Sequence, residues 1–193
     1  MKSKHFIIVA LAGLAIVFCS IAKPKSTIPP TVQWTDIENA QEQIKQKANK
    51  NKLIFIDCYT DWCGWCKVMD NKTFSDTLIA KLMNYYFISV KFNAEQKSDV
   101  IFNGTTYKYQ LRGNRGINLL SPVLQQNKLS YPSFVILNAD LSHKDMIQGY
   151  IEKGEFEMIV VYLGEGYDTK ISYEKFKEQY NTDIRPQILK KIE

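Results

Sequence analysis

The chain is short of side chains that bind metals, since its 193 residues include four cysteines and two histidines. A structural zinc site needs about four ligands, usually from a second Cys-x-x-Cys or a pair of histidines. Cys63 and Cys66 form one Cys-x-x-Cys pair, but Cys19 and His5 lie in an apolar N-terminal segment. The remaining ligands are therefore too few, and we expect neither a metal site nor a cofactor.

The chain also lacks blocks of like charge, internal repeats and low-complexity segments. Its formal net charge is +5, and lysines and glutamates are interspersed. No basic face alternates with aromatic residues as in nucleic-acid-binding proteins, so we expect no nucleic-acid partner. Hydrophobic residues make up 45% of the sequence and aromatic residues 12%, which is enough for one packed domain with extensions.

Residues 1–22 have the pattern of a signal peptide, with two lysines near the start and an apolar run over residues 6–21. Small residues allow cleavage after Ala22, while an uncleaved membrane anchor is the alternative. Lipidation at Cys19 is less favoured because the bulky Phe18 precedes it. In each case we expect an exported chain, periplasmic or otherwise extracytoplasmic, that contacts a membrane only through an uncleaved N-terminal segment.

The rest of the chain divides into a linker, a domain and an extension. Residues 23–33 contain three prolines and predict an extended linker. Residues 34–163 are predicted to form the domain. An insertion is expected at about residues 94–128, because the polar stretch there shows no clear period. Residues 164–193 form a C-terminal extension whose aromatic side chains are expected to pack back on the domain.

Hydrophobic periodicity predicts an α/β domain. Residues 35–38 match a capping box at the first helix, and residues 72–76 predict a break between two helices. A strand–helix–strand crossover implies parallel pairing and a later hairpin implies antiparallel pairing, so the central sheet is mixed and flanked by helices. The predicted strands span residues 53–59, 87–92, 134–137 and 146–151, and the predicted helices span residues 37–48, 67–71, 76–84, 117–126, 155–163 and 172–177.

The Cys-x-x-Cys pair lies where the strand at residues 53–59 passes into a helix. Cys63 is therefore expected near a helix N-terminus, where unpaired N–H groups and the helix dipole favour a thiolate. Cys66, one turn later, is placed to attack a mixed disulfide formed at Cys63. The pattern predicts redox chemistry. An inert structural disulfide is the alternative, but so short a loop would restrict the unfolded chain very little.

Two further residues of the same strand have predicted roles. Asp57 is a carboxyl group on an apolar strand, so its pKa is expected to be raised and it can accept a proton from Cys66 through a water molecule near neutrality. A carboxylate paired with a lysine is the alternative. By strand alternation Cys58 points the other way and is expected to be buried and inert, although a third redox cysteine is the other interpretation.

These features resemble the thioredoxin superfamily, and residues 72–76 resemble the C-terminal thioredoxin-like domain of DsbD and its exported relatives. The resemblance implies a thioredoxin fold, thiol–disulfide oxidoreductase activity and a cis peptide bond before Pro132. It covers about residues 34–163. It rests on residues 55–57 on one strand, 62–67 at its end, 90–93 on the next strand and 131–133 before the hairpin.

The resemblance also implies roles for single residues. Cys63 would attack and Cys66 would resolve, while Lys91 would neighbour the buried acid Asp57 unless it is an ordinary exposed lysine. The substrate surface would contain the aromatic residues beside the dithiol and the cis-proline turn, whose backbone can pair with an extended substrate segment. These predicted substrate-binding residues are Trp62, Gly64, Trp65, Tyr131 and Pro132.

Three features depart from the family pattern. Gly64 and Trp65 stand where thioredoxins commonly have Gly-Pro, the insertion lengthens the substrate side, and Cys58 is extra. We expect an exported oxidoreductase that reduces or exchanges protein disulfides with electrons from a membrane partner. A disulfide oxidase or isomerase is one alternative. A non-enzymatic binding or chaperone module on the same fold is the other.

Overall fold

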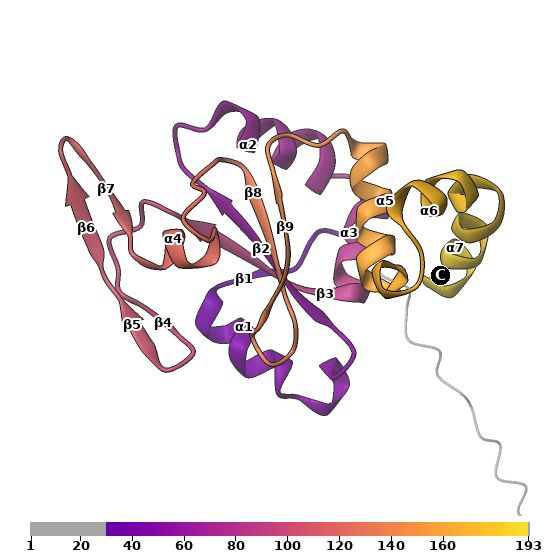
Figure 1. Ribbon diagram of the computed structural model, residues 1–193, viewed down its shortest axis with the longest axis horizontal. Coiled ribbons are helices and arrows are strands. Elements are labelled where there is room, and N and C mark those ends of the chain that lie inside the picture. The colour runs from indigo at the N-terminus through magenta and orange to yellow at the C-terminus, as the bar shows by residue number, and fades with distance from the viewer. Residues whose placement is uncertain (1–29, 193) are drawn as a thin grey trace, which may run out of the picture.

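The computed structural model describes residues 30–192, and the predicted targeting segment lies outside them. The central sheet consists of β1 (Trp34–Thr35), β2 (Leu53–Tyr59), β3 (Phe87–Asn93), β8 (Ser133–Leu137) and β9 (His143–Gln148). Its order is β1–β3–β2–β8–β9 (Figure 1). The β1–β3 and β3–β2 pairs are parallel, whereas the β2–β8 and β8–β9 pairs are antiparallel. This is the predicted mixed sheet, in the order of a thioredoxin fold.

Alternate residues of β2 enter two hydrophobic cores, one on each face of the sheet. Phe55 packs on one face against Phe134 and Phe156, with α3 and α5 covering it. Ile54 and Ile56 pack on the other face beneath α1 and α4. Both faces are therefore covered, which explains the almost unbroken apolar run in β2. The helices span Ile37–Ile44 (α1), Gly64–Met69 (α2), Thr77–Tyr86 (α3), Leu120–Leu124 (α4) and Lys153–Gly164 (α5).

The start and end of α1 correct the prediction from the capping box. Asp36, not Thr35, is the N-cap, and its side chain accepts a hydrogen bond from the Asn39 N–H at 2.7 Å. A carboxylate one residue nearer the helix competes successfully for the unpaired N–H groups. The helix ends at Ile44, so Ala48 is exposed in a 3-10 turn and does not extend the apolar face.

The sequence predicts that the helix breaks at residues 72–76, and the start of this predicted break is wrong. After α2 the chain continues through a π-helical turn, η2 (Asp70–Phe74), and leaves the helix at Ser75. Thr73 and Phe74 are buried, so packing rather than turn propensity decides this stretch. The sequence allows either Ser75 or Asp76 as the cap of the next helix, and Asp76 caps α3 by accepting hydrogen bonds from two backbone N–H groups.

The last hairpin and helix also differ from the predicted bounds. β9 begins at His143, three residues before the predicted start, because Leu137 pairs directly with His143 across a tight turn. The strand ends at Gln148, and Ile151 is buried outside it. In α5, Val161 is buried, whereas Ile159 is only partly buried.

Residues 100–118 form two β-hairpins, although no regular structure was expected between residue 94 and the helix predicted from residue 117. β4 (Val100–Phe102) pairs with β5 (Thr105–Tyr107), and β6 (Tyr109–Arg112) pairs with β7 (Arg115–Asn118). Both project from one side of the sheet (Figure 1). The predicted helix at residues 117–126 is reduced to α4, because Asn118 belongs to β7.

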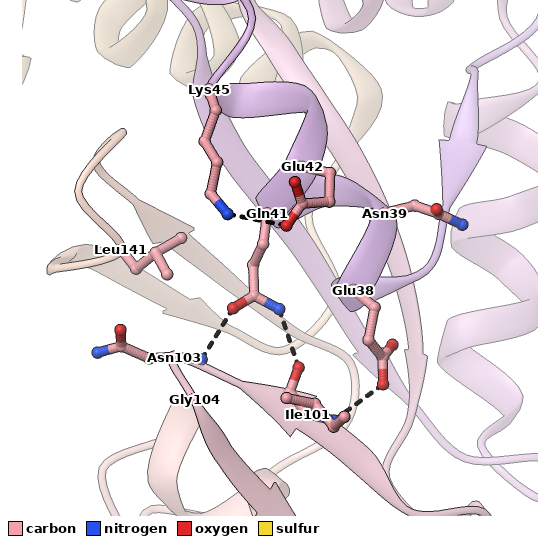
Figure 2. Close-up of a pocket in the computed structure, with 9 residues that line it drawn as sticks. All are labelled: Glu38, Asn39, Gln41, Glu42, Lys45, Ile101, Asn103, Gly104 and Leu141. Atoms are coloured by element: carbon pink, nitrogen blue, oxygen red, sulfur yellow. Dashed lines mark hydrogen bonds and ion pairs between the residues drawn. The ribbon is translucent and has the colours of Figure 1, made fainter.

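The β4–β5 hairpin is held by side chains of α1, as Figure 2 shows. Gln41 donates from Nε2 to the Ile101 carbonyl at 2.9 Å and accepts from the Asn103 N–H at 2.8 Å. Glu38 accepts from the Ile101 N–H at 2.9 Å, so it does not close a capping box. These contacts line a cavity of about 400 Å³ that contains neither cysteine of the Cys-x-x-Cys pair.

The C-terminal extension packs against the sheet-covering helices, as expected from its aromatic residues. Phe176 is fully buried, and its ring centre lies 5.0 Å from Tyr162 and 5.3 Å from Tyr180. Within residues 30–192, no helix is long and apolar enough to cross a membrane. The extension consists of η3 (Tyr167–Thr169), α6 (Tyr173–Gln179), η4 (Tyr180–Ile184) and α7 (Arg185–Ile192).

Candidate active site

Cys63 and Cys66 form a disulfide at the start of α2. Cys63 is the N-cap residue, and the Cys66 N–H donates a hydrogen bond to the Cys63 Sγ at 3.1 Å. In the reduced protein, a hydrogen bond from this N–H and the helix dipole would stabilise a thiolate on Cys63. Both residues are buried, with less than a tenth of their surface exposed. The disulfide therefore lies at a strand-to-helix junction, where the sequence places the Cys-x-x-Cys pair.

Asp57 lies on β2, the strand that leads to the disulfide, and is 1% exposed. Burial raises the pKa of its carboxyl group to about 6, although Lys91 opposes the shift. Lys91 is its cross-strand partner on β3, and the Lys91 Nζ lies 2.7 Å from Asp57 Oδ2. Among the described residues Asp57 Oδ1 has no hydrogen-bond partner. One carboxylate oxygen is thus held by a cation, and the other can accept a proton.

Lys91 is not an ordinary exposed strand lysine, since its side chain is only 22% exposed. Its Nζ contacts a carboxylate oxygen of Asp70 as well as Asp57. Burial alone would lower the pKa of Lys91, but the two carboxylates raise it. Its ammonium group also lies 5.0 Å from the ring centre of Trp34 and 5.1 Å from that of Tyr59. Lys91 is therefore a fixed positive charge beside the buried acid.

Sequence reasoning missed Asp70 as part of this network. Asp70 follows Cys66 by four residues, so the two side chains share one face of a continuous helix. That spacing could have indicated that Asp70 lies near Cys66, but spacing alone does not identify the ion-pair partner of Asp70. The partner, Lys91, comes from a different strand, and only the folded sheet brings it to Asp70.

Two exposed tryptophans flank the disulfide. Trp62 is 52% exposed and Trp65 is 58% exposed, so about half of each side chain is open to solvent. The Trp65 ring centre lies 4.9 Å from that of Tyr150, and the Trp62 ring meets Tyr131 edge to face at 6.0 Å. A Cβ at Gly64, between the cysteines, would contact nothing within 4 Å. The surface beside the disulfide is thus open and aromatic.

The turn before β8 borders the same surface. The Tyr131–Pro132 peptide bond is cis, as the resemblance implies. Pro132 is buried, and its carbonyl accepts a hydrogen bond from the Gly149 N–H at 2.8 Å. The Tyr131 hydroxyl lies 3.2 Å from the Ser121 Oγ of α4. Within residues 30–192 no backbone–backbone hydrogen bond involves Tyr131, so its N–H and C=O have no main-chain partner there.

Cys58 is not part of this surface. It is fully buried in the core beneath α1 and α4, and burial raises the pKa of its thiol well above the usual value. A thiol of this kind is a poor nucleophile. In the described part of the chain, no three His, Cys, Asp or Glu side chains group as they would around a metal ion.

The comparisons with known proteins include one match over the part of the chain that carries this site. A family model named Thioredox_DsbH, described as "Protein of unknown function, DUF255", matches residues 25–133. DsbD, a thiol:disulfide interchange protein of Campylobacter jejuni, is 44% identical over 57 residues. Human spermatogenesis-associated protein 20 is 33% identical over 60 residues. These matches cover 28% and 31% of this chain, but only 10% and 8% of the two relatives.

Solved structures with a similar fold include DsbH oxidoreductase, at 19% identity and a TM-score of 0.47. That match covers 74% of this chain and 92% of the other. The oxidised C-terminal domain of Neisseria meningitidis DsbD is 17% identical with a TM-score of 0.42, covering 69% and 91%. The family model spans more than half of the sequence, so the chain belongs to the Thioredox_DsbH family and carries its Cys63–Cys66 pair on a thioredoxin fold.

Proposed function

We propose that this protein is a thiol–disulfide oxidoreductase that reduces or exchanges disulfides in other proteins. The observation that carries the proposal is the Cys63–Cys66 disulfide at the start of α2, beside an open aromatic surface. A pair of cysteines one helical turn apart can pass between dithiol and disulfide without moving the backbone far. The buried acid on the strand that leads to this disulfide, Asp57, adds a group that can take up a proton during that change.

The reaction begins with the reduced protein. The Cys63 thiolate attacks one sulfur of a substrate disulfide, a Cys63–substrate disulfide forms, and the other substrate sulfur leaves as a thiolate. The Cys66 thiol then gives its proton to Asp57, and the Cys66 thiolate attacks the Cys63 sulfur. The second substrate sulfur leaves, and the Cys63–Cys66 disulfide appears. Two electrons have passed to the substrate, which takes up protons as its thiols form.

Lys91 is a positioning residue in this scheme. It holds one oxygen of Asp57 at 2.7 Å and limits how far burial raises the pKa of that carboxyl group. A pKa of about 6 leaves Asp57 mostly ionised near pH 7, ready to accept a proton. Without the neighbouring ammonium group, the carboxyl would keep its proton to higher pH and would accept none from Cys66.

The proposed direction is reduction, in an exported compartment. The two residues between the cysteines, Gly64 and Trp65, do not include the histidine found in strong oxidants of the superfamily. Residues 1–22 are the proposed export segment, cleaved or kept as an anchor. Compartments outside the cytosol are oxidising, so we propose that a membrane partner returns the protein to the dithiol state.

Replacing Cys66 with serine tests the proposed order of attack. Cys63 can still attack a disulfide in this variant, but no second thiol is present to release the product. We expect a covalent Cys63–substrate adduct to accumulate to nearly one equivalent, visible by intact mass spectrometry and lost on adding a reducing agent. The Cys63→Ser, Cys66→Ser double variant is the matched control and should form no adduct. Absence of an adduct from the single variant would refute the assigned order.

A further inference from the structure

A basic side chain from the β6–β7 hairpin lies on the aromatic surface beside the disulfide. The guanidinium carbon of Arg115, the first residue of β7, is 5.0 Å from the ring centre of Trp62. Trp62 immediately precedes Cys63 in the sequence. A hairpin outside the central sheet therefore contributes a cation next to the sulfur pair.

The backbone next to Arg115 is held in place by the packing of its hairpin. A Cβ at Gly116 would come within 2.5 Å of the Tyr109 ring, so this ring lies directly against the backbone next to Arg115. Asn118, at the end of β7, is fully buried, and its N–H donates to the Ala94 carbonyl at 2.8 Å. The base of the hairpin is thus fastened to the chain that follows β3. The fold therefore fixes the backbone that carries Arg115 and brings its guanidinium within reach of the Trp62 ring.

The charged residues of the β6–β7 hairpin segment are all basic. Residues 108–118 include one lysine and two arginines and no acidic residue. Within residues 30–192, Arg115 forms no salt bridge, so its guanidinium has hydrogen-bond donors to offer. An acidic group also contacts this tryptophan, since Glu95 accepts a hydrogen bond from Trp62 Nε1 at 2.9 Å. Glu95 thus fixes the edge of the ring while Arg115 lies over its face.

We propose that Arg115 is a specificity-determining residue that favours disulfides flanked by acidic side chains. This inference rests on the proposed function. An arginine fork binds a carboxylate through two parallel hydrogen bonds, and stacking on an aromatic ring orients it for that contact. The substrate that fits this arrangement is an extended polypeptide with Asp or Glu next to its disulfide cysteine. The same guanidinium disfavours a lysine or arginine at that position.

Three synthetic disulfide peptides, identical except for Asp, Asn or Lys beside one cysteine, test this directly. We expect kcat/KM of the wild-type protein to be about tenfold higher for the Asp peptide than for the Lys peptide at low salt. Arg115→Gln should reduce that ratio to about twofold, and Arg115→Glu should invert it. Lys81→Gln, which removes an exposed charge on α3, is the matched control and should leave the ratio unchanged.

Two further readouts separate recognition from a general effect on folding or reactivity. Glu95→Gln should raise the ratio, because it removes the acidic group near Arg115 while a side-chain oxygen remains for Trp62. In 1 M salt the wild-type ratio should fall towards that of Arg115→Gln, since an exposed ion pair is screened.

The two proposals fail in different ways. Equal kcat/KM for all three peptides, unaltered by Arg115→Gln, would overturn the assignment of Arg115 and leave the proposed function standing. No turnover of any peptide by the wild-type protein, or of a folded protein disulfide, would overturn the proposed function itself.

Discussion

Replacing Cys63 with serine is expected to lower the rate of disulfide reduction by more than about 10³-fold at neutral pH. A serine hydroxyl in the same place is not a usable nucleophile towards sulfur, and no other thiol can reach the substrate. Cys66 lies a turn deeper, and Cys58 is fully buried. The measurement is the turnover of a protein disulfide with a chemical reductant in excess, corrected for the reaction of the reductant alone.

Cys58→Ala is the matched control for this experiment. It removes a thiol from the core without touching the Cys63–Cys66 pair, so the rate should stay within about twofold of wild type. Small losses of stability are expected, because the deletion leaves a small cavity of about one sulfur atom. A Cys63→Ser variant that keeps full activity would favour the alternative of a binding or chaperone module, in which the dithiol has no role.

Replacing Asp57 with asparagine has the second-largest expected effect. General-base catalysis by a positioned group is typically worth about 10²–10⁴-fold, so we expect release of the mixed disulfide to slow by at least about 10²-fold near pH 7. The wild-type rate of this step should rise with pH through about 6, where Asp57 loses its proton. The variant should lack that rise. Stopped-flow measurement of product release against pH distinguishes the two.

Asp57→Asn lowers the rate of the reaction but is expected to raise the stability of the protein relative to wild type as pH rises. The pKa of Asp57 is raised from 3.8 to about 6 by burial, so between about pH 4 and 6 the folded state binds more protons than the unfolded state. Its contribution to the free energy of unfolding therefore falls as pH rises through this window, by up to about 3 kcal/mol in all.

Asp57→Asn should thus gain stability relative to wild type as pH rises from 4 to 6, measured by urea unfolding at each pH. A constant difference between the two proteins across this range would mean that Asp57 titrates normally. Asp57→Glu offers a further check, because it keeps the charge but displaces the carboxylate from Lys91. Its rate should fall while its pH dependence remains.

The elements that carry the chemistry have strong local signals in the sequence. The apolar run of β2, the Cys-x-x-Cys pair at its end and the proline before β8 each fix a local conformation with little help from distant parts of the chain. The burial of Asp57 follows from the same run, because both faces of β2 are covered. These features were therefore predictable from the residues themselves.

The hairpins were missed although one of them carries a recognisable turn. Asn103 and Gly104 both have positive φ, at 47° and 75°, as a two-residue turn of type I′ requires. An Asn-Gly pair is a strong hairpin signal, but the flanking strands have three residues each and show too little alternation. Their pairing depends instead on side chains of α1, which a local pattern does not report.

The contacts made by Asp70 and Arg115 were beyond prediction for a related reason. Each depends on a partner from a distant element: Lys91 for Asp70 and Trp62 for Arg115. Sequence spacing places a side chain on one face of its own helix or strand, but the meeting of two such faces is decided by the packing of the whole domain. The fold was needed to connect the hairpins with the disulfide.

The reduction potential of the Cys63–Cys66 couple tests the central claim most directly. It is measured by equilibrating the protein with a thiol–disulfide buffer and quantifying the fraction of protein in each state. We predict a value near that of thioredoxin, roughly −270 mV, which would make the protein a donor of electrons that depends on a dedicated supplier. A value of roughly −120 to −180 mV would contradict the reductive role and indicate an oxidase or isomerase instead.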